Sequence, residues 1–236
     1  MSEILSINSE YADKLKTILK LRAEPVAVKL IKDGDEYPSG PKLPEAQMSH
    51  CQAVFRARKG ECIKMPFSMQ SCHVGTAVLG MSETPQKIGS GEFHAGVNIH
   101  DSVSAAKKMI DERIMIPYRT EGEVVCPLNK ADFVPDVVIL VDIVERIYWV
   151  AALMTAEKGG RATFSTSPFQ CACEDITVVP MVSDKPNVSL GCYGCRKRTD
   201  MAPDELACGI PYKLMSGYIA HLEKYAGGVF LQAKRD

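Results

Sequence analysis

The sequence predicts one compact domain of the α/β or mixed α+β class, spanning residues 1–236, with a mixed sheet covered by helices. Stretches with an apolar residue every three or four positions alternate with short continuous apolar runs, which is typical of helices that alternate with buried strands. A chain of 236 residues with 46% apolar and 24% charged residues can bury a sizeable core. It has no repeat, low-complexity tract or long charged linker that would divide it. The strand order does not follow from these patterns.

The first half of the chain contains two amphipathic helical patterns, over 11–21 and 101–112, with three further elements between them. In order, we expect a helix over 11–21 behind a Ser9 cap, a strand over 25–31, a helix over 51–58, a strand-to-helix turn over 71–80 and a helix over 101–112. The spacing of Leu15 and Ile18 favours a helix over a strand in the first segment. Cys72 and His73 would be among the first helical residues after the turn, so Cys51 and Cys72 would both lie near element ends.

The second half begins with the most apolar stretch of the chain. Residues 136–141 form a run typical of a strand covered on both faces, and apolar residues at helical spacing follow over 143–154, before the glycines at 159–160. Charged residues within this stretch argue against a membrane span, namely Asp142, Glu145 and Arg146. After it we expect strands over 161–167, 177–180 and 188–190, then a helix that starts at Pro211 and ends before Gly227.

Charge and the N-terminus restrict the partners and the compartment. A net charge of −1 gives no basic surface for nucleic acid or for an anionic membrane, so neither partner is expected. Residues 1–10 lack the cationic start and apolar core of a signal peptide. We therefore expect a cytoplasmic protein.

The nine cysteines are the most informative feature for function. A chain of this size folds without disulfides, and thiols in a reducing compartment serve packing, metal binding or redox work. Cys192 and Cys195 are two residues apart with Gly194 between them, a turn in which both sulfurs can point to one side and bind one metal or cluster. A redox dithiol and structural thiols remain the alternatives for this pair.

Four segments together resemble a known family: 50–53 (HCQA), 90–94 (SGEFH), 165–170 (STSPFQ) and 189–195 (SLGCYGC). They are similar to the archaeal and anaerobic bacterial family called domain of unknown function 169, over about residues 10–225. The resemblance implies a cytoplasmic protein of an anaerobe, and no reaction. It also implies a set of motif cysteines, Cys51, Cys72, Cys173, Cys192 and Cys195, and leaves Cys62, Cys126, Cys171 and Cys208 outside the motifs.

The remaining candidate ligands have plain structural alternatives. Cys51 and Cys72, taken alone, would more often fill a core than bind a metal. Residues 171–173 alternate as a strand would, so Cys171 could replace Cys173 as the ligand. His50 and His73 each adjoin a candidate cysteine and could bind a metal or hydrogen-bond a sulfur, although isolated histidines are more often structural.

Charged and polar segments near the cysteines could bind a cofactor or a ligand. Arg196 and Arg198 follow the cysteine pair, and their charge would lower a thiolate pKa, offset the charge of a cluster or bind an anionic substrate. Residues 165–170 have the composition of a small-molecule rim, with Glu174 and Asp175 just beyond. The loop 89–94 could bind a ligand through its amides or be a plain turn.

Three functions follow from these patterns. The first is an iron–sulfur protein with one 4Fe–4S cluster on Cys192, Cys195 and two of Cys51, Cys72 and Cys173, which transfers electrons or acts as an oxidoreductase on a small ligand. With only three cysteine ligands, the fourth iron would be open to substrate. The second is a zinc-binding or metal-trafficking module without catalysis. The third is a protein that binds an anionic metabolite or cofactor and whose cysteines are structural. A redox partner or small ligand is expected, and the apolar C-terminal stripe leaves room for a homodimer.

Overall fold

One six-stranded sheet organises the protein. The computed structural model describes residues 2–167, 169 and 172–226. The strands are β1 (Val26–Lys32), β2 (Ile63–Pro66), β3 (Thr120–Pro127), β4 (Val137–Ile143), β5 (Asn187–Ser189) and β6 (Glu205–Pro211), in the spatial order β2-β3-β1-β4-β6-β5. Each pairing in this sheet is antiparallel. The predicted fold class is confirmed. Of the two forms that we expect, the protein has the mixed α+β form, because its strand pairings are antiparallel.

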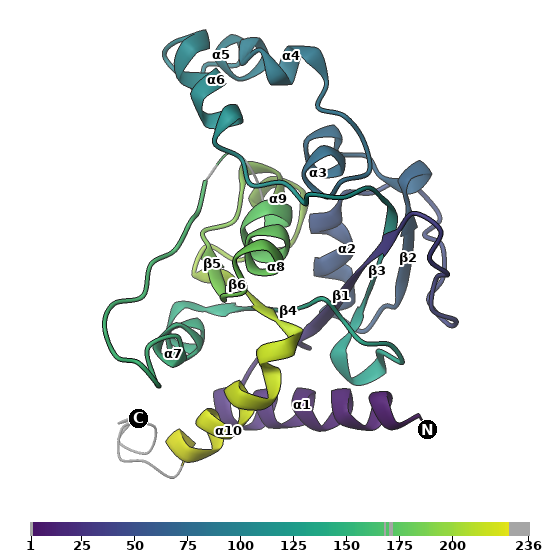
Figure 1. The fold of residues 1–236 in the computed structure, drawn as a ribbon, viewed down its shortest axis with the longest axis vertical. Coiled ribbons are helices and arrows are strands. Elements are labelled where there is room, and N and C mark those ends of the chain that lie inside the picture. Colours follow the sequence, from purple (N-terminus) through teal and green to yellow (C-terminus); the bar gives the residue numbers. More distant parts are fainter. Residues whose placement is uncertain (1, 168, 170–171, 227–236) are drawn as a thin grey trace.

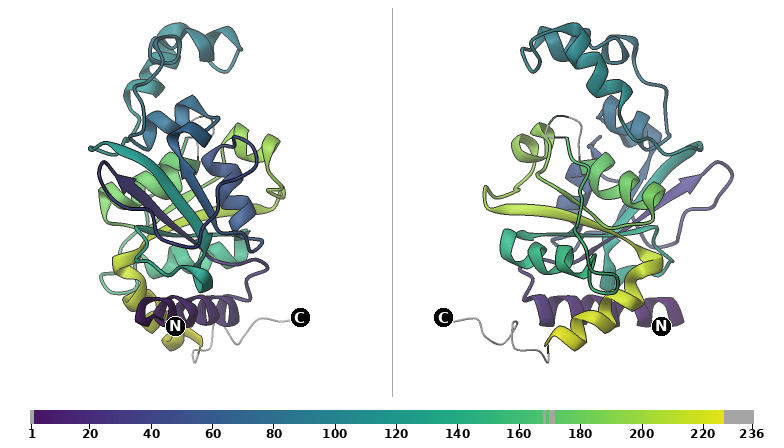
Figure 2. Two further views of the ribbon diagram at one scale, coloured as in Figure 1. Left: turned by 90° about the vertical axis from the view of Figure 1, so that its right-hand side faces the viewer. Right: turned by 60° about the vertical axis from the view of Figure 1, so that its left-hand side comes forward.

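Helices cover both faces of the sheet (Figure 1). They are α1 (Glu3–Leu19), α2 (His50–Ala57), α3 (His73–Val78), α4 (Gln86–Gly89), α5 (Glu92–Gly96), α6 (Val103–Asp111), α7 (Val144–Leu153), α8 (Val179–Ser183), α9 (Tyr193–Arg198) and α10 (Met215–Ala226), with a π-helical turn at Glu174–Val178 that runs into α8. Helices α4 to α6 form a small lobe that projects from the rest of the molecule (Figure 2). No helix of the described chain is long and apolar enough to cross a bilayer.

The core has two halves because strand side chains alternate between the faces of the sheet. Val28 of β1 packs with α2, the π-helical turn and the segment of Cys192 and Cys195. Its neighbour Ala27 packs on the opposite face with α1, α7 and α10. The cysteines therefore divide by face. Cys51, Cys173, Cys192 and Cys195 belong to the first half, whereas Cys62, Cys126 and Cys208 belong to the second.

Several predicted elements are correct and others are wrong. The strands at β1, β4 and β5 and the helices at α2, α6 and α7 lie where the patterns place them. The first helix starts earlier, at Glu3, because Ser2 rather than Ser9 accepts a hydrogen bond as the cap. The last helix starts at Met215, since Pro211 ends β6, where a proline needs no ladder donor.

The predicted strands over 161–167 and 177–180 are wrong. The described residues 161–167 have no regular structure, and residues 177–180 belong to the π-helical turn and α8. The β-branched composition of 176–179 favours a strand locally. Packing decides otherwise, because this helix lies directly on β6. The carbonyl oxygen of Ile176 would be only 1.9 Å from a Cβ at Gly209.

Candidate metal centre

Three buried cysteines from distant parts of the chain meet at one point. The sulfurs of Cys51, Cys192 and Cys195 all lie within 4.8 Å of one another. The Cys192 and Cys195 sulfurs are 3.3 Å apart, and the three side chains are at most 6% exposed. Such a set of converging thiols can hold a metal.

Local helix geometry places each of these sulfurs. Cys51 is the second residue of α2, which starts at a capping box formed by Ser49 and Gln52. Cys192 caps the start of α9, and its sulfur accepts the backbone N–H of Cys195 at 3.4 Å. Gly191, just before, has φ +77 and lies so close to Met201 that a side chain would collide with it. The turn therefore presents two sulfurs on one side, as the spacing predicts.

Contacts among the three thiols favour the thiolate form of Cys192 over those of Cys195 and Cys51. The thiols of Cys195 and Cys51 donate to Cys192 and lower the pKa of Cys192, with further help from the backbone N–H groups of Cys195 and Ala172. The same contact with Cys192 raises the pKa of Cys195 to about 12, and it raises that of Cys51 as well. A metal bound here would displace protons from these thiols.

Cys72 and Cys173 each place a sulfur beside Gly75. A Cβ at Gly75 would lie 3.6 Å from the Cys72 sulfur and 3.3 Å from the Cys173 sulfur. Cys72 is the cap of α3 rather than a helical residue, and it accepts the Gly75 N–H at 3.4 Å. Cys173 lies in a helix, so the expected strand over 171–173 is wrong, and Cys171 lies outside the described residues. Cys173 follows Ala172, whose backbone N–H donates to the Cys192 sulfur. The structure does not bring the sulfurs of Cys72 and Cys173 into the group formed by Cys51, Cys192 and Cys195.

The two candidate histidines have different environments. His50 is buried, with Nδ1 2.6 Å from Glu123 and Nε2 3.0 Å from Thr177. Both ring nitrogens are therefore engaged in a buried network, which Gln70 extends by donating to Glu123 at 2.8 Å. His73 is the first residue of α3 and is exposed. The structure thus places neither ring with the three converging sulfurs.

The side chains of Arg196 and Arg198 contact the backbone of the loop or the solvent rather than the cysteine sulfurs. Arg196 donates to the carbonyl oxygens of Leu190, Ala202 and Glu205, and so joins both ends of the segment around α9. Arg198 is exposed and lines a shallow pocket with Lys59. The loop 89–94 is a helix start, in which Gly91 packs against the backbone of α6.

Comparison with known proteins places the chain in a family. Residues 14–221 match the domain of unknown function 169, DUF169, described as uncharacterised ArCR. The chain belongs to the DUF169 family. An uncharacterised protein of Methanocaldococcus jannaschii is 26% identical over 220 residues, which cover 92% of this chain and 94% of that protein. No solved structure matches the chain. The resemblance inferred from the four sequence segments is thereby confirmed.

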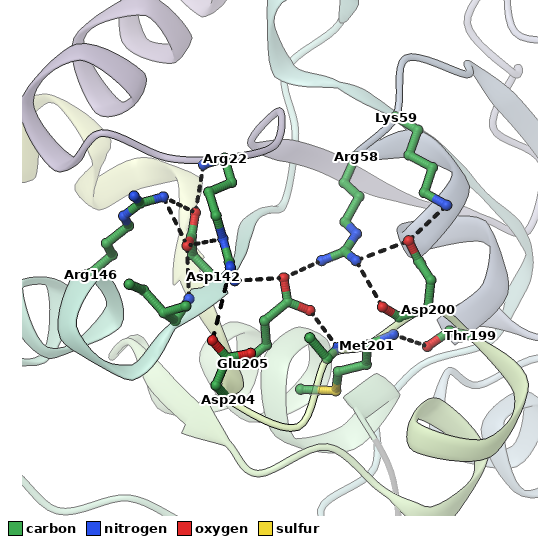
Figure 3. Close-up of polar contacts among 12 residues, drawn as sticks. Arg22, Arg58, Lys59, Asp142, Arg146, Thr199, Asp200, Met201, Asp204 and Glu205 are labelled. Carbon is green, nitrogen blue, oxygen red and sulfur yellow. Dashed lines mark hydrogen bonds and ion pairs between the residues drawn. The ribbon is translucent and has the colours of Figure 1, made fainter.

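A network of charged side chains holds the two cysteine-bearing segments of this DUF169 protein together (Figure 3). Arg58, at the end of α2, contacts Glu205 at 3.0 Å and Asp200 at 3.1 Å. Arg22 contacts Glu205 at 3.2 Å and Asp142 at 3.0 Å. These contacts fix the segment after α9 against α2. No local sequence pattern indicates these contacts, because partners such as Arg58 and Glu205 are far apart in the chain.

A pocket of about 550 Å³ lies between α6 and the segment before the π-helical turn. Its lining includes Thr166, Phe169, His100, Glu174 and Asp175. Burial raises the pKa of Glu174 to about 7 and that of Asp175 to about 6. Asp175 accepts hydrogen bonds from Thr166 at 2.8 Å and Ser189 at 2.6 Å. The described residues of the expected rim over 165–170 do line a pocket. The carboxyl groups of Glu174 and Asp175 line the same pocket.

Proposed function

We propose that this DUF169 protein carries a metal centre on Cys51, Cys192 and Cys195, and that the centre is an iron–sulfur cluster used in electron transfer or redox chemistry on a small ligand. The observation that carries the proposal is the convergence of three buried thiols from two segments of the chain. Buried thiols often pack as small apolar groups, but three sulfurs in mutual contact form a donor set rather than ordinary core filling.

The donor set fits a soft metal. All three donors are sulfur, and thiolates favour iron–sulfur clusters, zinc and copper(I) over hard cations. The start of α9 directs a backbone N–H group at the Cys192 sulfur, which favours its thiolate form. A four-cysteine set would need Cys72 or Cys173 to move toward the triad, because neither sulfur belongs to the group that lies within 4.8 Å.

The sulfur spacing favours zinc as a second candidate occupant. Around one tetrahedral ion with bonds of about 2.3 Å, sulfurs lie about 3.8 Å apart. The sulfurs of Cys51, Cys192 and Cys195 are all within 4.8 Å of one another, close to that value. In a 4Fe–4S cluster each cysteine binds a different iron, so side-chain rotation would have to move the sulfurs apart. A single zinc ion needs little such movement.

A ligand-binding role is supported by the pocket next to the centre. Asp175 lines this pocket, and its Oδ2 accepts the hydroxyl of Ser189. The same hydroxyl oxygen accepts the N–H of Gly191 at 3.1 Å, immediately before Cys192. A small molecule bound in the pocket would thus be two hydrogen bonds away from the cysteine turn. With three cysteine ligands, a cluster could present one open iron to such a ligand and act as an oxidoreductase.

Anaerobic purification followed by an absorption spectrum tests the proposal, with iron, acid-labile sulfide and zinc measured on the same sample. A brown protein with broad absorption near roughly 400 nm and about four irons and four sulfides per chain is the expected result. A colourless protein with about one zinc per chain would replace the cluster with the second candidate. A folded protein that contains no metal, and binds none when iron and sulfide or zinc are added, would contradict both.

A further inference from the structure

Cys62 and Cys126 form a thiol pair that the metal centre does not use. Cys62 is half-buried just before β2, and Cys126 is buried on β3. Their side chains belong to the half of the core that packs on α1, on the opposite face of the sheet from the triad. The two thiols are close enough for each to shift the pKa of the other. This pair is therefore separate from any metal bound by Cys51, Cys192 and Cys195.

The strand register places the two cysteines directly opposite each other. Ile63 pairs with Val125 in the antiparallel ladder of β2 and β3, so Cys62 faces Cys126 one step further along. The C=O of Cys62 and the N–H of Lys64 both point away from β3, to Lys42. Ile63 therefore directs its own N–H and C=O at Val125, and the cysteine position is a pair without backbone hydrogen bonds.

That position suits a disulfide. At such a pair the Cα atoms of an antiparallel ladder are about 4.5 Å apart and the side chains are at their closest. Disulfides need Cα atoms about 4.4 to 6.8 Å apart, so the bond can form without a large backbone movement. Cys208, by contrast, is a lone buried thiol on β6, and its sulfur contacts a backbone carbonyl at 3.8 Å.

The two thiols differ in reactivity. The contact with Cys126 and the charge of Lys130 together lower the pKa of Cys62 to about 7, although its partial burial opposes them. The same contact raises the pKa of Cys126. The more exposed member is thus the one that is a thiolate near neutral pH, and the thiolate is the nucleophile in disulfide exchange.

We propose that Cys62 and Cys126 form a thiol–disulfide exchange site, in which Cys62 is the attacking thiol, Cys126 the resolving thiol, and the oxidant a low-molecular-weight disulfide. The Cys62 thiolate attacks one sulfur of that disulfide, which gives a mixed disulfide and releases one thiolate. Cys126 loses its proton and attacks the Cys62 sulfur, which releases the second small thiol. Two protein thiols are oxidised and one small disulfide is reduced to two thiols. A dithiol of the same class reverses the reaction.

The test uses the full chain, prepared anaerobically with its metal content measured. The protein is treated with glutathione disulfide, its remaining thiols are blocked with N-ethylmaleimide under denaturing acid conditions, and its peptides are analysed by mass spectrometry. We expect a linked pair of peptides containing Cys62 and Cys126, full N-ethylmaleimide labelling of Cys208, and recovery of both thiols after dithiothreitol. The metal content should not change.

Two variants assign the roles. In Cys126→Ser, glutathione should stay attached to Cys62, because no thiol remains to displace it. In Cys62→Ser, Cys126 should remain unmodified. Wild-type protein that keeps glutathione on Cys62, or in which neither cysteine reacts, would overturn the proposal. A link between either cysteine and any other residue would overturn it as well. None of these outcomes depends on whether the triad holds iron or zinc.

Discussion

The guanidinium of Arg58 lies 3.0 Å from the carboxylate of Glu205, and both side chains are almost fully buried, at 8% and 7% exposed. Arg58 ends the helix that carries Cys51, and Glu205 starts the strand that follows the segment of Cys192 and Cys195. This ion pair therefore joins the two segments that carry the three converging cysteines. It explains how sulfurs more than 140 positions apart in sequence keep a fixed relation.

Replacing Arg58 should weaken both the fold and the metal site. Arg58→Met leaves the buried Glu205 with Arg22 as its remaining cationic partner. We expect a loss of about 3 kcal/mol in the free energy of unfolding, measured by urea denaturation. Arg56→Met, on the same helix, removes only an exposed pair with Glu61 and should cost less than about 1 kcal/mol. Equal effects of the two substitutions would contradict this role for Arg58.

Gly209→Ala should be strongly destabilising. The new Cβ would lie 1.9 Å from the carbonyl oxygen of Ile176, so β6 and the π-helical turn would have to separate. We expect a loss of about 2 to 3 kcal/mol in the free energy of unfolding. The control is Gly217→Ala on the exposed side of α10, where nothing lies within 4 Å. It should gain up to about 1 kcal/mol, because alanine favours a helix interior more than glycine does. A stable Gly209→Ala protein would show that the turn does not rest on β6.

The alkylation rate of Cys62 should depend on pH around neutrality. Its pKa is lowered to about 7, so the reactive thiolate is the minor form at pH 6 and the major form at pH 8. We expect the rate of iodoacetamide labelling at Cys62 to rise steeply from pH 6 to pH 8 and then to level off. In Cys126→Ala, which removes the thiol that contacts Cys62 and leaves no donor in its place, the midpoint should move to higher pH. An unchanged midpoint would contradict the contribution of Cys126.

Cys173→Ser tests whether Cys173 is a fourth ligand of the centre. Cys173 is 1% exposed and lies beside Gly75 and Cys72. If it is the fourth ligand of a cluster, Cys173→Ser should alter the absorption and magnetic spectra of the iron–sulfur protein. If the fourth position is open, Cys173→Ser should leave those spectra unchanged. Cys208→Ser, in the other half of the core, is the matched control and should have no spectral effect.

The sequence predicts the turn of Cys192 and Cys195 and the fold class because both depend on local patterns. Cys192 and Cys195 are close in the chain, and a two-residue spacer with a glycine restricts where their sulfurs can point. The apolar run at β4 and the amphipathic pattern of α7 are likewise local. Choosing Cys51 as the partner of this pair depends on the family resemblance, since no spacing rule connects residues 51 and 192.

Other features depend on tertiary contacts that local patterns do not contain. The residues of the π-helical turn have a strand-like composition, but Gly209 lets a helix lie close against β6. The strands β2, β3 and β6 went unrecognised because their apolar runs are short or broken by glycine and charged residues. The pair of Cys62 and Cys126 becomes visible only when the register of β2 and β3 is known.

The most direct test of the metal centre is the metal content of Cys51→Ser beside that of Cys208→Ser, with both proteins purified anaerobically. Both replace a buried cysteine of the core, but only Cys51 lies with Cys192 and Cys195. We expect Cys51→Ser to lose most of its bound iron or zinc and Cys208→Ser to retain the wild-type amount. Full metal content in a folded Cys51→Ser protein would contradict the three-cysteine centre.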